Sequence, residues 1–136
     1  MPHSTVHYRI INRNVIMFQN FIIVGLGGAI GSMLRYGVTI LSAHLGIFMS
    51  GQAATLLVNI LGSMLMGWIT GMCQQSHWTL FLTMGLCGGF TTFSTFSMQN
   101  VKLLEEGYYI TAVLYILLTL VLCVTSCIIG YAISSH

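Results

Sequence analysis

Apolar residues fill four long segments of the chain, and short polar stretches separate them. The segments cover about residues 16–43, 52–72, 78–101 and 108–133. A transmembrane helix needs roughly 20 apolar residues to cross a hydrocarbon core about 30 Å thick, and each segment reaches that length. The pattern predicts an all-α membrane protein with four transmembrane helices and very short loops. We expect residues 1–15 to form a polar tail ahead of an uncleaved first span, and residues 16–136 to form one transmembrane domain.

The overall composition supports a membrane protein and argues against two other classes. Of the 136 residues, 56% are hydrophobic and 4% are charged, whereas soluble domains carry about 25% charged residues. Four basic and two acidic side chains are too few for a nucleic-acid-binding surface. The acidic residues are adjacent in a loop, the histidines lie in tails or loops, and the cysteines lack zinc spacing, so we expect no enzyme.

The third segment contains a stretch that is unusual for a lipid-facing helix. Residues 85–97 read Gly-Leu-Cys-Gly-Gly-Phe-Thr-Thr-Phe-Ser-Thr-Phe-Ser. Backbone groups freed at membrane depth are tolerated only where they face protein or line a polar cavity. The stretch therefore predicts a broken helix at a transport site, with the break near Gly88 and Gly89.

Aromatic and amide side chains near this break have two interpretations each. Phe93 and Phe96 share one helix face beyond the break, beside a hydroxyl-bearing row that contains Ser94. Such aromatic residues usually pack in a core, but the positive edges of two rings can also hold a small anion. Asn59 lies in the middle of the second segment. Its amide either bonds a neighbouring helix or replaces water around an anion.

Other polar and small residues also follow helical spacing. Tyr115, Thr119 and Cys123 recur every four residues along the last segment. This polar track serves either internal hydrogen bonding or an ion path. Arg35, near the end of the first segment, either anchors the helix by snorkelling or draws anions into a vestibule. The same segment contains Gly27, Gly28 and Gly31, and the four-residue spacing of Gly27 and Gly31 predicts close helix packing.

Two features of the chain favour a dimer. Four helices are too few to enclose a polar path and also cover it with lipid-facing side chains. The basic residues are balanced, because Arg9 and Arg13 lie on one side of the membrane and Arg35 and Lys102 on the other. Such a balance permits insertion in either orientation.

Taken together, these motifs resemble the Fluc/CrcB family of bacterial fluoride channels. The resemblance rests on residues 27–36, on Asn59-Ile60-Leu61-Gly62, and above all on residues 88–96, and it covers nearly the whole chain after the tail. It implies a channel in the bacterial inner membrane through which fluoride leaves the cytoplasm passively, so that intracellular fluoride falls. It also implies an antiparallel, dual-topology homodimer with two fluoride pathways.

The resemblance further implies roles for individual residues. The implied fluoride pathway consists of Asn59, Phe93, Phe96, Ser94, Thr95, Tyr115 and Thr119. Arg35 is then a vestibule or anchor residue. A structural sodium ion at the dimer centre is held by the backbone carbonyls of Gly88 and Thr91, and oxygen ligands suit such a hard cation.

Two other functions fit four spans. A proton-coupled small multidrug exporter has similar architecture, but its chemistry needs a carboxylate within the membrane, and the four predicted spans contain neither Asp nor Glu. A non-transporting membrane scaffold would use the glycines and hydroxyls only for helix packing.

Overall fold

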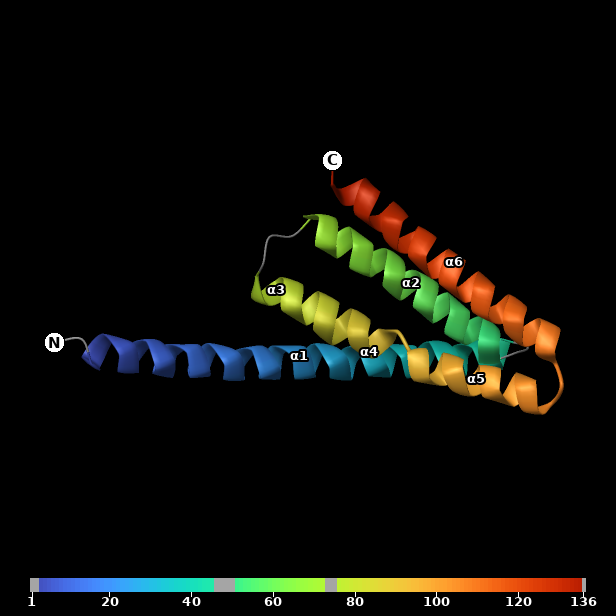
Figure 1. Ribbon diagram of the computed structural model, residues 1–136, viewed down its shortest axis with the longest axis horizontal. Coiled ribbons are helices and arrows are strands. Elements are labelled where there is room, and N and C mark those ends of the chain that lie inside the picture. The colour runs from blue at the N-terminus through green and yellow to red at the C-terminus, as the bar shows by residue number, and fades with distance from the viewer. Residues whose placement is uncertain (1–2, 46–50, 73–75, 136) are drawn as a thin grey trace.

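The computed structural model describes residues 3–45, 51–72 and 76–135, and the secondary structure of these ranges is entirely helical (Figure 1). The elements in chain order are α1 (His3–Leu45), α2 (Gly51–Met72), α3 (His77–Leu80), the π-helical η1 (Phe81–Cys87), α4 (Gly88–Phe90), α5 (Phe93–Glu105) and α6 (Tyr109–Ser134). The predicted all-α class is confirmed for the described ranges. The expected loop at residues 44–51 and the turn at residues 73–77 lie largely outside them.

Three helices are long and apolar enough to cross a membrane. These are the stretch Arg13–His44 of α1, all of α2 and the whole of α6. The segment predicted as a span at residues 78–101 is divided instead among α3, η1, α4 and α5. Among the described residues, at least three helices thus have the length and composition of membrane spans, as expected for a multi-pass membrane protein.

Helix α1 is longer than a membrane is thick. Its 43 residues correspond to roughly 65 Å at 1.5 Å per residue. The residues predicted as a polar tail are helical from His3 onward and continue into the first span without interruption. In Figure 1 this N-terminal part projects beyond the start of α3.

The helices pack as two close pairs. Helix α2 lies along α6, and α1 lies along the run from α3 to α4 (Figure 1). Gly67 of α2 lies against the Cys127 carbonyl, and Gly130 of α6 lies against the Met64 carbonyl. A Cβ at either glycine would collide with the facing backbone. Small residues thus bring these two helices into backbone contact, as membrane helix pairs often require.

The second pair is also joined through glycine. A Cβ on Gly27 would lie 2.9 Å from the Cα of Gly85, and one on Gly89 would lie 2.9 Å from the Cα of Gly28. Gly31 lies against the carbonyl of Leu86. The predicted role of Gly27 and Gly31 in close packing is confirmed.

The helix break lies at Thr91 and Thr92 rather than at Gly88 and Gly89. Gly88 has helical backbone angles (φ −62°, ψ −38°), whereas Thr91 (φ −76°, ψ 155°) and Thr92 (φ −147°, ψ 108°) are extended. The Thr92 hydroxyl accepts the N–H of Thr95 and so caps the start of α5. Thr91 therefore ends α4 and Thr92 begins α5, while Gly89 contacts α1.

Candidate functional site

The side chain of Asn59 holds the helix break in place. Its Oδ1 accepts the backbone N–H of Thr92 at 2.8 Å, and its Nδ2 donates to the carbonyl of the same residue at 3.3 Å. Thr92 is buried, so these backbone groups need partners inside the protein. The interhelical role that the sequence allowed for Asn59 is therefore confirmed. Its Nδ2 carries a second hydrogen in addition to the one that Thr92 receives.

A cavity of about 230 Å³ lies beside this bond, between α2, the break and α6. Its lining consists of Asn59, Ser63, Thr91, Thr92, Phe93, Phe96, Thr119, Leu120, Cys123 and Val124. Five predicted site residues thus meet around one space, namely Asn59, Thr91, Phe93, Phe96 and Thr119. The lining contains no charged side chain, so an ion in the cavity would meet dipoles and ring edges only.

The two phenylalanines of the cavity differ in their surroundings. Their ring centroids are 5.6 Å apart at an interplanar angle of 44°. Phe96 is only 6% exposed and its ring also packs against Tyr115 at 5.2 Å, whereas Phe93 is 75% exposed. Packing in a core therefore accounts for Phe96 but leaves Phe93 unexplained within a single chain.

The polar track on α6 is partly occupied by internal hydrogen bonds. Thr119 donates its hydroxyl hydrogen to the carbonyl of Tyr115 at 2.7 Å, the internal bond that the sequence allowed. The Tyr115 hydroxyl donates to Oε1 of Gln99 at 2.8 Å. Gln99 in turn donates from Nε2 to the hydroxyl of Thr55 at 3.0 Å. The Tyr115 hydroxyl also lies 3.3 Å from the carbonyl of Gln52, so Tyr115 joins α6 to α5 and joins α6 to α2 both directly and through Gln99.

A second cavity, of about 350 Å³, lies on the other side of the break and also has Thr92 in its wall. Arg35, Thr95 and Gln99 contribute polar groups to it, together with Ser32, Tyr36, Thr39, Gly51, Thr55 and Val58. Arg35 is half-buried there. Ser94 lines neither of these two cavities but a third one of about 390 Å³, beside Thr95 and Lys102.

The break also changes the bonding of the backbone carbonyls that precede it. In a continuous helix the Thr92 N–H would bond the Gly88 carbonyl, but here it bonds Asn59. Likewise the Thr95 N–H, which would bond the Thr91 carbonyl in a continuous helix, bonds the Thr92 hydroxyl. Among the described residues, no group of three or more His, Cys, Asp or Glu side chains is placed to hold a metal. A cation at this place would rest on carbonyl oxygens.

Comparison with known proteins identifies the group to which this architecture belongs. Residues 22–131 match the family described as "CrcB-like protein, Camphor Resistance (CrcB)". The chain belongs to the CrcB family. The match includes the whole of α2 to α5 and both cavities around the break.

Curated CrcB-family relatives cover most of the chain. A protein of Azobacteroides pseudotrichonymphae genomovar. CFP2 is 37% identical over 123 residues, which are 87% of this chain and 98% of the relative. One of Shewanella amazonensis is 42% identical over 117 residues, 82% of this chain and 93% of the relative. One of Methylobacterium nodulans is 44% identical over 103 residues, 72% of this chain and 82% of the relative. All three are named "Fluoride-specific ion channel FluC".

Sequence reasoning missed three residues of this CrcB-family site. Thr92 caps α5, bonds Asn59 and lines both cavities. Gln99 and Thr55 connect Tyr115 to α2. A signal for Gln99 was present, because it is a neutral amide two turns after the break within an apolar segment. Its partner on another helix could not be read from one sequence.

Proposed function

We propose that this protein is a fluoride channel that lets the anion leave the bacterial cytoplasm passively. The observation that carries the proposal is the uncharged cavity beside the helix break in a chain whose relatives are named fluoride-specific channels. Fluoride enters acidified cells as neutral HF and dissociates inside. A passive pore then lets the negative-inside membrane potential drive the anion out.

Fluoride must exchange its strongly held water for donors in the pore. Asn59, Phe93 and Phe96 line the cavity, and the donors that we propose are the second Nδ2 hydrogen of Asn59 and the positive edges of the two rings. Thr119 lines the same space, but its hydroxyl hydrogen is bonded to Tyr115. Weak donors without a fixed positive charge let the ion enter and also leave, which conduction requires.

The two cavities on either side of Thr92 form successive parts of the proposed path. Arg35 in the larger cavity raises the local concentration of anions before they reach the narrower aromatic site. Thr95 contributes a hydroxyl to the same cavity. Ser94 lines a neighbouring cavity together with Lys102. The ring of Tyr115 packs against the ring of Phe96.

The proposed assembly is an antiparallel homodimer in which each chain crosses the membrane four times. The run from α3 to α5 serves as the fourth crossing, interrupted at Thr91 and Thr92. In the proposed dimer the partner covers Phe93, whose ring lines the cavity and is 75% exposed in the single chain. The balanced basic residues support insertion in both orientations.

The carbonyls of Gly88 and Thr91 fit a structural sodium ion at the centre of such a dimer. The break removes or weakens their helical hydrogen bonds, and a hard cation prefers oxygen ligands. Two inverted copies would supply these carbonyls from both sides. Because a ligand that binds only the folded state stabilises it, thermal unfolding should occur at a higher temperature in Na⁺ than in N-methyl-D-glucamine. Equal unfolding temperatures would argue against the ion.

Fluoride efflux from liposomes tests the function. We expect vesicles that contain the purified protein and are loaded with fluoride to release it rapidly when a potassium gradient with valinomycin balances the charge, as read with a fluoride electrode. Chloride-loaded vesicles should retain their anion. Protein-containing vesicles that hold fluoride as long as empty vesicles would refute the proposal.

A further inference from the structure

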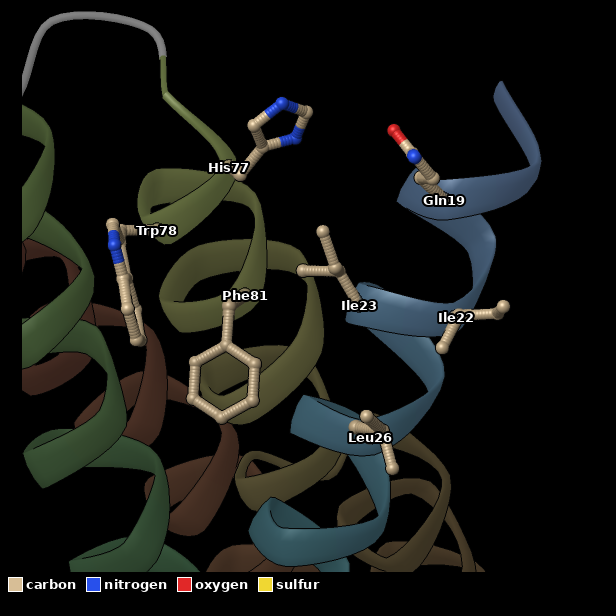
Figure 2. A pocket seen from close by; sticks show the side chains of 7 residues that line it. All are labelled: Gln19, Ile22, Ile23, Leu26, His77, Trp78 and Phe81. Carbon is tan, nitrogen blue, oxygen red and sulfur yellow. The ribbon is translucent and has the colours of Figure 1, made fainter. Parts of the chain in front are cut away.

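An apolar cavity lies away from the proposed ion path, between α1 and the start of the α3–η1 run. Its volume is about 550 Å³. The lining residues are Gln19, Ile22, Ile23, Leu26, His77, Trp78 and Phe81. Figure 2 shows Ile23 extending from α1 toward the α3–η1 run and Phe81 on that run near Trp78, with Gln19 and His77 at one end. The cavity is thus polar at one end and apolar below it.

The residues around the polar rim are typical of a membrane surface. Arg13 is charged and precedes the apolar run that starts at Val15, and Asn20 lies two helical turns after Arg13 on the same face. His77 bonds Asn20 through Nδ1 and Oδ1 at 3.1 Å. Trp78 follows His77 and is 73% exposed, in keeping with the enrichment of tryptophan at membrane interfaces.

The charge above this rim is positive and lacks a carboxylate nearby. Arg13 is exposed and stands about 10 Å beyond Asn20 along the helix. The only acidic residues of the chain are Glu105 and Glu106. Glu105 ends α5, which lies at the opposite end of the molecule from the start of α1 (Figure 1).

We propose that this cavity binds an anionic phospholipid, with an acyl chain against Ile23, Leu26 and Phe81 and the phosphate toward Arg13. The apolar walls suit a hydrocarbon chain, the His77–Asn20 pair suits the glycerol and ester level, and Arg13 supplies a charge complementary to the headgroup. The site is separate from fluoride conduction and does not rest on it.

Trp78 provides a direct test because it is one of only two tryptophans in the chain. In the Trp68→Phe variant, Trp78 is the single tryptophan, so the fluorescence signal comes from this residue alone. It is reconstituted into vesicles in which either phosphatidylglycerol or phosphatidylcholine carries brominated acyl chains, which quench tryptophan on contact. One cation near the bilayer surface gives an anionic lipid roughly a fivefold preference. We therefore expect titrations of brominated lipid to give about a fivefold higher apparent affinity for phosphatidylglycerol.

Two further variants separate a specific site from general lipid contact. Arg13→Gln should abolish the preference while quenching continues, and Arg13→Lys should retain it. The matched control is Trp78→Phe, in which Trp68 reports from α2 and shows no preference. Equal affinities at Trp78, or a preference that survives Arg13→Gln, would overturn the proposal. So would the absence of quenching by both lipids, since a second protein copy would then cover the cavity.

Discussion

Substitution of Asn59 tests whether one side chain holds the helix break. Asn59→Ala removes both hydrogen bonds to Thr92, at 2.8 Å and 3.3 Å, and leaves the N–H and C=O of a buried residue without their side-chain partner. A buried polar group that loses its partner costs about 1–3 kcal/mol. Interhelical side-chain bonds in membrane proteins average about 0.6 kcal/mol, since the unfolded state in lipid also finds partners.

These figures give a lower and an upper bound for the unfolding free energy that Asn59→Ala should lose. Two bonds at the membrane average give about 1 kcal/mol, and two fully unpaired groups give at most about 6 kcal/mol. Water from the adjacent cavity can reach the freed groups, so we expect a value near the lower end, about 2 kcal/mol. The control is Ser63→Ala, one turn further along α2 and in the same cavity lining. Because Ser63 does not hold the break, Ser63→Ala should lower the free energy of unfolding by less than about 0.5 kcal/mol.

Reversible unfolding in mixed detergent and SDS micelles measures the loss of unfolding free energy in Asn59→Ala and in Ser63→Ala. Fluoride efflux from liposomes measures how each substitution affects conduction. Asn59→Asp keeps an acceptor for the Thr92 N–H but adds a negative charge beside an anion path, so its efflux should fall further than its stability does. If Asn59→Ala unfolds like the parent protein, then the side chain does not hold the break. If Asn59→Asp conducts fluoride at the parent rate, then the cavity is not the pathway.

The remaining predictions concern other parts of the structure. Phe93→Ile and Phe96→Ile should both slow fluoride efflux strongly, but only Phe96→Ile should also lower stability, because Phe96 is buried against Tyr115 while Phe93 is 75% exposed; equal stability losses would contradict this. Gly67→Ala should cost about 1–3 kcal/mol in the same unfolding assay, because its Cβ meets the Cys127 carbonyl. The control Gly25→Ala has no atom within 4 Å of its new Cβ and should be neutral or slightly stabilising. Tyr115→Phe keeps the ring contact with Phe96 but loses the bond to Gln99, so stability should fall by about 1 kcal/mol; an unchanged value would show that this bond contributes nothing.

The sequence predicted the helical class, and local patterns pointed to four of the residues that line the first cavity, namely Asn59, Phe93, Phe96 and Thr119. Asn59 stood out as an amide in an apolar span, and Phe93 and Phe96 stood out through their spacing. The structure places them around one space with Thr119. These residues are found by asking which polar or aromatic groups are unusual at membrane depth.

The position of the break could not be predicted as well. Two adjacent glycines are a stronger local signal for a break than two threonines, yet Gly88 and Gly89 remain helical. The deciding interactions are tertiary, because Gly89 contacts Gly28 on α1 and Thr92 bonds Asn59 on α2. The spacing of residues within one segment does not predict which other helix packs against a glycine of that segment. The connection from Tyr115 through Gln99 to Thr55 was missed for the same reason.

The glycine contacts between α1 and the run from η1 to α4 restrict how this protein can move. Where Gly27 faces Gly85 and Gly28 faces Gly89, main chain lies against main chain with no side chain between them. A longitudinal shift by even one residue would drive a neighbouring Cβ into the opposing backbone. The end of α4 is thereby held in register with α1, so the two segments cannot slide along each other, whereas the exposed side chain of Phe93 beyond the break is not held by these contacts.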